Sequence, residues 1–182
     1  MYIAIGMVEF NSIAKGIEAC DAMVKVAKVD LIEAHPVCAG KYIVYITGNV
    51  DAVRTSVNRG LEVGERNIVD KFIIPNVHPQ VQPALTSSSQ VVKLKALGCI
   101  ETFSAASAIL AADAAVKAAK VDLIEIRLAN GMGGKSFVTF TGDVGAVQSA
   151  TGAGVAMVEN EGFLVESIVI PSPHDYMGKA IL

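Results

Sequence analysis

The sequence predicts an α/β (α+β) protein made of two tandem ferredoxin-like βαββαβ domains. First, the seven residues 27–33 (Ala-Lys-Val-Asp-Leu-Ile-Glu) recur without change at 119–125, 92 positions later. Second, both copies alternate strand-like and helix-like patterns in the same order. Third, a polar stretch that contains Pro83 and three serines separates the copies, as expected of a connecting segment. Two copies indicate a tandem-domain protein rather than a solenoid.

The duplication extends over nearly the whole chain. At the same spacing, residues of the first copy match residues of the second: Gly6 and Gly98, Glu9 and Glu101, Ser12 and Ser104, Asp21 and Asp113, Lys25 and Lys117. After a two-residue insertion Gly40 matches Gly134 and Lys41 matches Lys135. Near the end of each copy, at a spacing of 96, the matches are Ile74 and Ile170, Pro75 and Pro171, and His78 and His174. We therefore predict a first domain over 1–79, a linker over 80–95 and a second domain over 96–182.

Each element of the first copy follows from local patterns. Residues 3–10 form an apolar strand, and Ser12 is a suitable N-cap for the helix that follows it. One face of that helix is apolar and consists of Ile13, Ile17, Cys20, Val24 and Ala27. Residues 29–34 form the next strand, and Pro36 and Gly40 mark a turn.

The rest of the copy completes a split βαβ pattern. Residues 42–47 read as a strand that is buried on both faces, and Gly48 and Asn49 precede a second helix with Val50, Val53, Val57 and Leu61 at helical spacing. Residues 68–74 form the closing strand. This order predicts a sheet with both helices on one face. In the second copy this helix carries Gly145, Gly152 and Gly154, each about 1 kcal/mol less favourable than Ala, so it depends on tertiary packing or lets another backbone come close.

Composition excludes several function classes. The net charge is −3 and no basic run is present, which argues against nucleic-acid binding. No stretch supplies the roughly 20 apolar residues of a membrane span, and residues 1–4 lack the features of a signal peptide, so we expect a cytoplasmic protein without membrane contact. The 52% hydrophobic content predicts apolar surface that associates with partners. No catalytic constellation is apparent, and we expect no enzyme.

Several motifs carry a resemblance to a known family. Residues 21–25 followed by 29–31, and 113–117 followed by 121–123, resemble the first-helix signature of bacterial microcompartment shell domains. Residues 47–50 and 141–144 resemble the turn into the second helix, and residues 74–78 and 170–174 resemble the closing motif. The tandem order and the turn 38–41 (Cys-Ala-Gly-Lys) are most similar to the trimeric, iron–sulfur-binding propanediol-utilisation type.

This resemblance implies a structural role in a shell. Three chains would form a pseudohexameric homotrimer, which would tile edge to edge with other microcompartment shell proteins in the cytoplasm and contact encapsulated redox enzymes. The resemblance places shell-edge contacts at Lys25, Lys117, His78 and His174. Many single-domain members carry Arg between the prolines of the closing motif, where this chain has Asn76 and Ser172. The edge contact made by that Arg is therefore not carried over.

Cys38 is the candidate metal ligand. One cysteine per chain cannot hold a cluster, but a three-fold axis through the turn would bring three thiolates together, enough for one [4Fe–4S] cluster per trimer with a non-protein fourth ligand. In the resembling type the matching cysteine holds such a cluster, which implies electron relay across the shell. The second copy has Asn130 at this position. The alternatives are a turn cysteine without a role and an open metabolite-conducting pore. The expected lining of the centre is Ala39, Gly40, Asn130, Gly131, Met132, Gly133 and Gly134.

The other polar residues have simpler interpretations. Cys20 and Cys99 are expected to be small buried side chains, and the repeated Glu9, Glu101, Glu33 and Glu125 to be structural or solvated carboxylates. The glycine-rich loop 130–135 is interpreted as a strand connection, although free amides there could hold a phosphate. A His35–Cys38 catalytic pair lacks an orienting Asp. A rival function is a ferredoxin-like small-molecule sensor, which predicts a small oligomer with saturable ligand binding.

Overall fold

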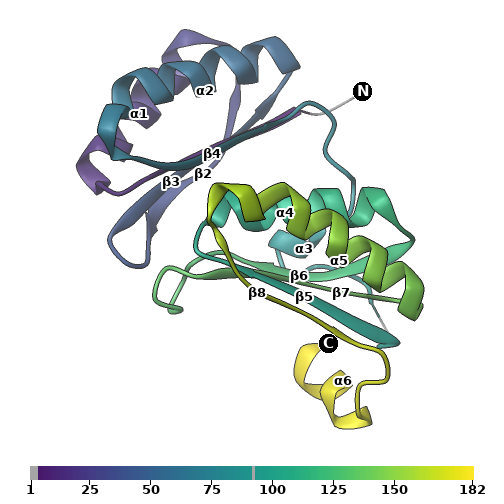
Figure 1. Cartoon of the computed structure of the whole chain (residues 1–182). Coiled ribbons are helices and arrows are strands. Elements are labelled where there is room, and N and C mark those ends of the chain that lie inside the picture. The colour runs from purple at the N-terminus through teal and green to yellow at the C-terminus, as the bar shows by residue number, and fades with distance from the viewer. Residues whose placement is uncertain (1–3, 92) are drawn as a thin grey trace. The chain divides into compact units, whose positions relative to one another are not determined.

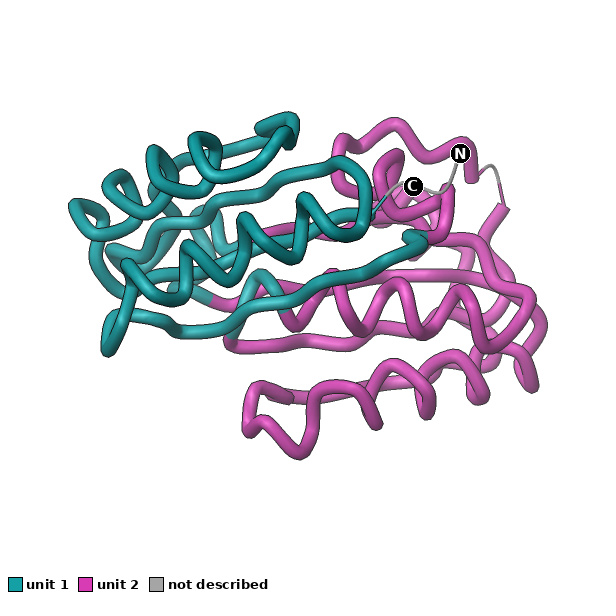
Figure 2. Tube along the Cα trace, turned by 90° about the horizontal axis from the view of Figure 1, so that it is seen from above, with its two compact units in different colours: residues 1–77, 104–106, 129–134 teal, residues 78–103, 107–128, 135–182 magenta. Residues whose placement is uncertain are grey.

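A computed structural model describes residues 4–91 and 93–182 of the chain, which divide into two compact units. Unit 1 holds the residues up to 77 together with the short segments 104–106 and 129–134, and unit 2 holds the remainder (Figure 2). Each unit contains a four-stranded antiparallel sheet with the strand order of a ferredoxin-like βαββαβ fold. The predicted fold class is confirmed in both copies.

Unit 1 is built from the first copy. Its elements are β1 (Ala4–Phe10), α1 (Ile13–Val26), β2 (Asp30–Val37), β3 (Lys41–Gly48), α2 (Val50–Gly64), η1 (Glu65–Asn67) and β4 (Ile68–Ile74). The sheet order is β2-β3-β1-β4, and α1 and α2 cover one face of it (Figure 1). Ser12 caps α1 by accepting from the backbone N–H of Lys15 at 3.3 Å, and Asn49 caps α2 by accepting from Ala52 N–H at 2.8 Å.

The core of unit 1 lies between the sheet and its helices. Val8, Val44, Met23, Val53 and Val57 are buried there. The two central strands β1 and β3 are buried on both faces, as predicted for residues 42–47, except that Thr47 is only half-buried. Their near-continuous apolar sequence follows from this double burial, because neither face has to meet water in this chain.

The apolar stripe of α1 faces this core only at Cys20. Ile17 is 55% exposed and Ile13 is 40% exposed, whereas Gly16 and Met23 are buried. A Cβ on Gly16 would lie 2.6 Å from the Tyr42 ring, so α1 contacts the sheet through its small residues. Close docking through the glycine turns the larger apolar side chains outward.

Unit 2 is built from the linker and the second copy. Its elements are α3 (Val81–Leu85), β5 (Ala96–Thr102), α4 (Ala105–Ala118, whose first two residues belong to unit 1), β6 (Val121–Arg127), β7 (Ser136–Gly142), α5 (Val144–Val158), η2 (Glu159–Glu161), β8 (Leu164–Ile170) and α6 (Asp175–Ile181). The sheet order is β6-β7-β5-β8. In Figure 1, α4 and α5 cover one face of this sheet, and α6 lies on the other side of it. No helix of the described residues is both long and apolar enough to cross a membrane.

The connecting segment is more ordered than its composition predicts. Residues 81–85 form α3, with Val81 and Ala84 buried, where the sequence predicted only a loop. Pro83 is compatible with this helix because it lies in the first turn, where no intrahelical partner for its missing N–H is required.

The glycines of α5 differ in their surroundings. A Cβ on Gly154 would lie 2.9 Å from the carbonyl oxygen of Ala111 in α4 and 2.5 Å from Ile100. Added Cβ atoms on Gly145 and Gly152 would meet nothing within 4 Å. Of the two explanations expected for these glycines, the close approach of another backbone is therefore found at Gly154, where the backbone of α4 lies against α5.

Candidate functional site

The Cys38 turn lies beside the segment 129–134 in unit 1. The backbone N–H of Cys38 donates to the carbonyl oxygen of Ala129 at 3.0 Å, and the N–H of Gly131 donates to Cys38 Sγ at 3.3 Å. A Cβ on Gly134 would lie 3.2 Å from the Cys38 carbonyl oxygen, so glycine permits this close approach. The fold thus brings together the residues that the sequence assigned to the central site.

Most of these residues are accessible in the single chain. Cys38 and Met132 are half-buried, Gly134 is buried, and the others are exposed: Ala39, Gly40, Asn130, Gly131 and Gly133. Gly40 has a φ of 78° and Gly131 a φ of 73°, backbone conformations that a side chain would strain. Two exposed turns held by backbone contacts therefore surround a cysteine.

The other thiols are poor ligands. Burial raises the pKa of Cys99 to about 11, and the nearby charge of Glu101 adds to this effect. Burial also raises the pKa of Cys20, with a further contribution from Asp21. Both side chains are half-buried, whereas the sequence predicted buried ones. Among the described residues, no three His, Cys, Asp or Glu side chains gather within one chain as a metal site.

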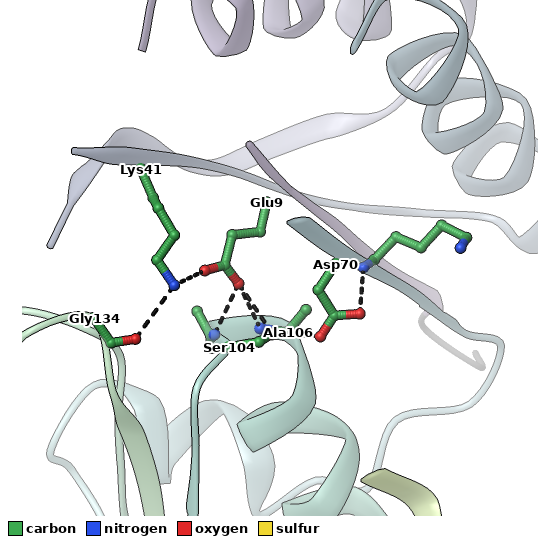
Figure 3. A network of polar contacts seen from close by, with 8 residues as sticks. Glu9, Lys41, Asp70, Ser104, Ala106 and Gly134 are labelled. Carbon is green, nitrogen blue, oxygen red and sulfur yellow. Dashed lines mark hydrogen bonds and ion pairs between the residues drawn. The ribbon is translucent and has the colours of Figure 1, made fainter. Parts of the chain in front are cut away.

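A buried carboxylate network also lies in unit 1 (Figure 3). Glu9 is fully buried, and its Oε2 accepts from the backbone N–H of Ala105 at 2.8 Å and from Ser104 Oγ at 3.0 Å. Lys41 Nζ lies 2.5 Å from Glu9 Oε1 and donates to the carbonyl oxygen of Gly134 at 3.2 Å. The carboxylate therefore caps the first turn of α4 and neutralises a nearly buried lysine.

A second carboxylate joins this network from the neighbouring strand. Asp70 lies opposite Glu9 in the β1–β4 register, and its carboxylate also contacts Ser104 Oγ, so the two carboxylates share the single hydroxyl proton of Ser104. The structural interpretation of Glu9 is correct, but the sequence analysis missed its partners. The repeated pairs Glu9 with Lys41 and Glu101 with Lys135 carried the signal, because each pair recurs in both copies.

The matching pair in unit 2 is open to solvent. Lys135 Nζ lies 2.6 Å from Glu101 Oε1, but the Glu101 side chain is 30% exposed. Glu166, which lies opposite Glu101 in the β5–β8 register, is exposed. The two copies thus have carboxylates at matching positions in very different surroundings.

The predicted shell-edge residues fall into two sets. Lys25 is exposed and pairs with Asp21 at 2.6 Å, and His174 is exposed at the start of α6. Lys117 pairs with Asp113 at 2.5 Å. The same Asp113 accepts from the backbone N–H of His78 at 2.8 Å. Lys117 and His78 therefore share one aspartate.

His35 is not placed for catalysis with Cys38. Its Nε2 lies 3.2 Å from Glu33 Oε2, and its Nδ1 lies 3.1 Å from the carbonyl oxygen of Pro36. These contacts engage both ring nitrogens of His35.

The duplicated βαββαβ fold, with Cys38 and the glycine-rich loop on adjacent turns, defines a tandem-domain protein of the microcompartment shell class. The BMC domain model matches residues 4–77 and 96–173, and the chain belongs to this family. Over 179 residues it is 40% identical to the bacterial microcompartment shell protein PduT of Citrobacter freundii, covering 98% of this chain and 97% of that protein. It is a structural shell subunit of a bacterial microcompartment, not an enzyme.

Other relatives support the same assignment. A crystal structure of a microcompartments protein from Desulfitobacterium hafniense DCB is 55% identical and superimposes with a TM-score of 0.86, covering 98% of this chain and 99% of that one. Over 87 residues the chain is 38% identical to the carboxysome shell protein CsoS1A of Hydrogenovibrio crunogenus, which covers 46% of this chain and 91% of that protein. The single-copy length of the latter relative agrees with the duplication seen here. The family assignment favours a shell subunit over a small-molecule sensor.

Proposed function

We propose that three copies of this chain close a ring in which three Cys38 thiolates hold one [4Fe–4S] cluster, and that the ring is a shell subunit that relays electrons across the shell. The observation that carries the cluster proposal is the hydrogen bond from Gly131 N–H to Cys38 Sγ. Backbone donors to cysteine sulfur stabilise the thiolate form and tune the potential of iron–sulfur centres.

The residues present fit such a cluster only through symmetry. One chain supplies a single thiol on an accessible turn, and three chains supply three, which leaves the fourth iron to a non-protein ligand. When bound, the cluster supplies one-electron chemistry. The chain's own residues hold the thiol in place through the Cys38 and Gly131 amides, and encapsulated redox enzymes are the proposed electron partners.

Cys38→Ser tests this proposal. We expect anaerobically reconstituted wild-type protein to contain one cluster per three chains, with broad visible absorbance, and the Cys38→Ser variant to lose iron, sulfide and colour while keeping the mass of the trimer. Cys99→Ser is the matched control and should keep the cluster. A wild-type trimer without iron after reconstitution would refute the cluster, and loss of the trimer in Cys38→Ser would make the residue structural.

An open pore is the second candidate, favoured by the glycine loop. Added Cβ atoms on Gly131 and Gly133 would meet nothing within 4 Å, so this loop leaves open space beside the Cys38 turn. A cluster bound on the three-fold axis of the ring would block a passage along that axis, so the two candidates exclude each other. An iron-free trimer would therefore favour metabolite conduction through this opening.

The edges of the ring are the proposed contacts with other shell proteins. Lys25 and His174 are exposed, and each lysine pairs with the aspartate four residues before it, Lys25 with Asp21 and Lys117 with Asp113. Asp113 also accepts from the backbone N–H of His78. We propose that all four lie at tile edges, with Lys25 the most accessible of the two lysines.

A further inference from the structure

Matching positions on the two sheets differ in burial. In unit 1, Met7 and Glu9 are fully buried and Phe72 is 4% exposed. Their counterparts in the same strand registers of unit 2 are Cys99, Glu101 and Ile168, and the last is 44% exposed. A depression of about 280 Å³ opens over this face of unit 2, lined by residues that include these three, Phe137 and Glu166. These positions are therefore buried on the sheet of unit 1, whereas the matching positions on the sheet of unit 2 border an open depression.

The first helices of the two copies show the opposite difference. Ala105 and Ile109 of α4 are fully buried, whereas their counterparts Ile13 and Ile17 of α1 are exposed. The apolar stripe of α1 therefore has no cover in the single chain, although the matching stripe of α4 does. An exposed apolar helix face of this kind is typical of a surface that meets a partner.

The contact in unit 1 identifies the partner. There the carboxylates Glu9 and Asp70 receive the segment 104–106, which supplies backbone amides and a serine hydroxyl. The carboxylates that match them are Glu101 and Glu166, and the segment that matches 104–106 is 12–14. A second copy of this chain carries the segment 12–14.

We infer that Glu101 and Glu166 of one chain bind the first turn of α1 of the next chain, accepting from Ser12 Oγ and from the backbone amides of Ile13 and Ala14. The inference rests on the proposed ring and names the polar contact that closes it. The charges are complementary, because a helix N-terminus carries partial positive charge and two carboxylates face it. Lys135 would then balance Glu101 as Lys41 balances Glu9. Ile13 and Ile17 would cover the open depression.

Two substitutions on opposite sides of this contact test it. Glu101→Gln should raise the dissociation constant of the assembly about tenfold per contact, because a charge-assisted acceptor is lost. Ser12→Asp should raise it roughly a hundredfold, because like charges then face each other. Aspartate is a good N-cap, so the Ser12→Asp chain keeps a stable α1. Sedimentation velocity over a dilution series measures both effects.

The double variant provides the sharpest readout. Glu101→Gln weakens the wild-type assembly but should strengthen the Ser12→Asp assembly, because it removes the repulsion. This reversal of sign is expected only if the two side chains meet across the contact. The rate of Cys99 alkylation at pH 9 gives an independent measure of the contact. It should be slow in the wild-type assembly, where the thiol is covered, and faster in the Ser12→Asp variant. Glu62→Gln, an exposed carboxylate on α2, is the matched control and should change neither measurement.

The outcomes separate this inference from the proposed function. A wild-type protein that remains a monomer would refute the ring itself. A wild-type trimer whose dissociation constant is unchanged by both Ser12→Asp and Glu101→Gln would leave the ring standing and overturn the contact. Additive effects of the two substitutions would likewise overturn it.

Discussion

At the residue scale, the same glutamate has two different environments in one chain. Glu9 is fully buried and accepts hydrogen bonds from two backbone amides and a hydroxyl, whereas the Glu101 side chain is 30% exposed and forms an ion pair with Lys135. Burying a carboxylate is costly unless it is paired and hydrogen-bonded, and Glu9 satisfies both conditions. Its removal would leave Lys41 nearly buried without its ion pair.

Glu9→Ala should lower the free energy of unfolding by about 3–5 kcal/mol, the usual cost of removing one partner of a buried ion pair. Urea unfolding measures this cost. The measurement is made in the Ser12→Asp variant, because that chain is expected to stay dissociated and association then contributes little. Glu62→Ala, which breaks an exposed pair with Arg59, should cost less than about 1 kcal/mol. Equal costs for the two substitutions would mean that the Glu9 network does not stabilise the fold.

At the element scale, helix packing is decided by where the small residues lie. α1 docks through Gly16 and α5 through Gly154, and both glycines allow an approach that a Cβ would block. This arrangement leaves Ile13 and Ile17 outward on α1. The helical spacing of the stripe was recognised from the sequence, but its direction depended on the glycine on the opposite face.

Gly154→Ala and Gly152→Ala should have opposite effects on stability. Gly154→Ala places a Cβ 2.9 Å from the Ala111 carbonyl oxygen and should cost about 1–3 kcal/mol through overpacking. Gly152→Ala meets nothing within 4 Å and should stabilise α5 by up to about 1 kcal/mol through helix propensity. Thermal unfolding of both variants gives the comparison, and stabilisation by Gly154→Ala would contradict the close α4–α5 approach.

At the scale of the whole molecule, stability is expected to depend on association. The exposed stripe of α1 and the open face of the unit 2 sheet are apolar surfaces that the single chain leaves in water. Their burial in the proposed ring would stabilise the folded chain in proportion to how much of it is assembled. The chain should therefore be least stable when dilute.

The melting temperature should rise by about 2–4 °C for each tenfold increase in chain concentration across the dissociation range. Ser12→Asp should remove this dependence over the same range, because that variant stays dissociated. Calorimetry at three concentrations distinguishes the two proteins. A wild-type melting temperature that is independent of concentration over this range would argue against coupled folding and assembly.

The sequence by itself determined the duplication, the βαββαβ order and the family, because these depend on local patterns and on motifs that recur along the chain. It also singled out Cys38 and the loop 130–134, and the two turns do lie side by side. Burial was decided only by the tertiary structure. Glu9 and Glu101, or Ile109 and Ile17, match in the two copies of the repeat, yet the first of each pair is buried, whereas Glu101 is half-buried and Ile17 is exposed. These differences in burial depend on which surfaces the fold brings together. The local sequence pattern around a residue does not specify which distant residues will pack against it.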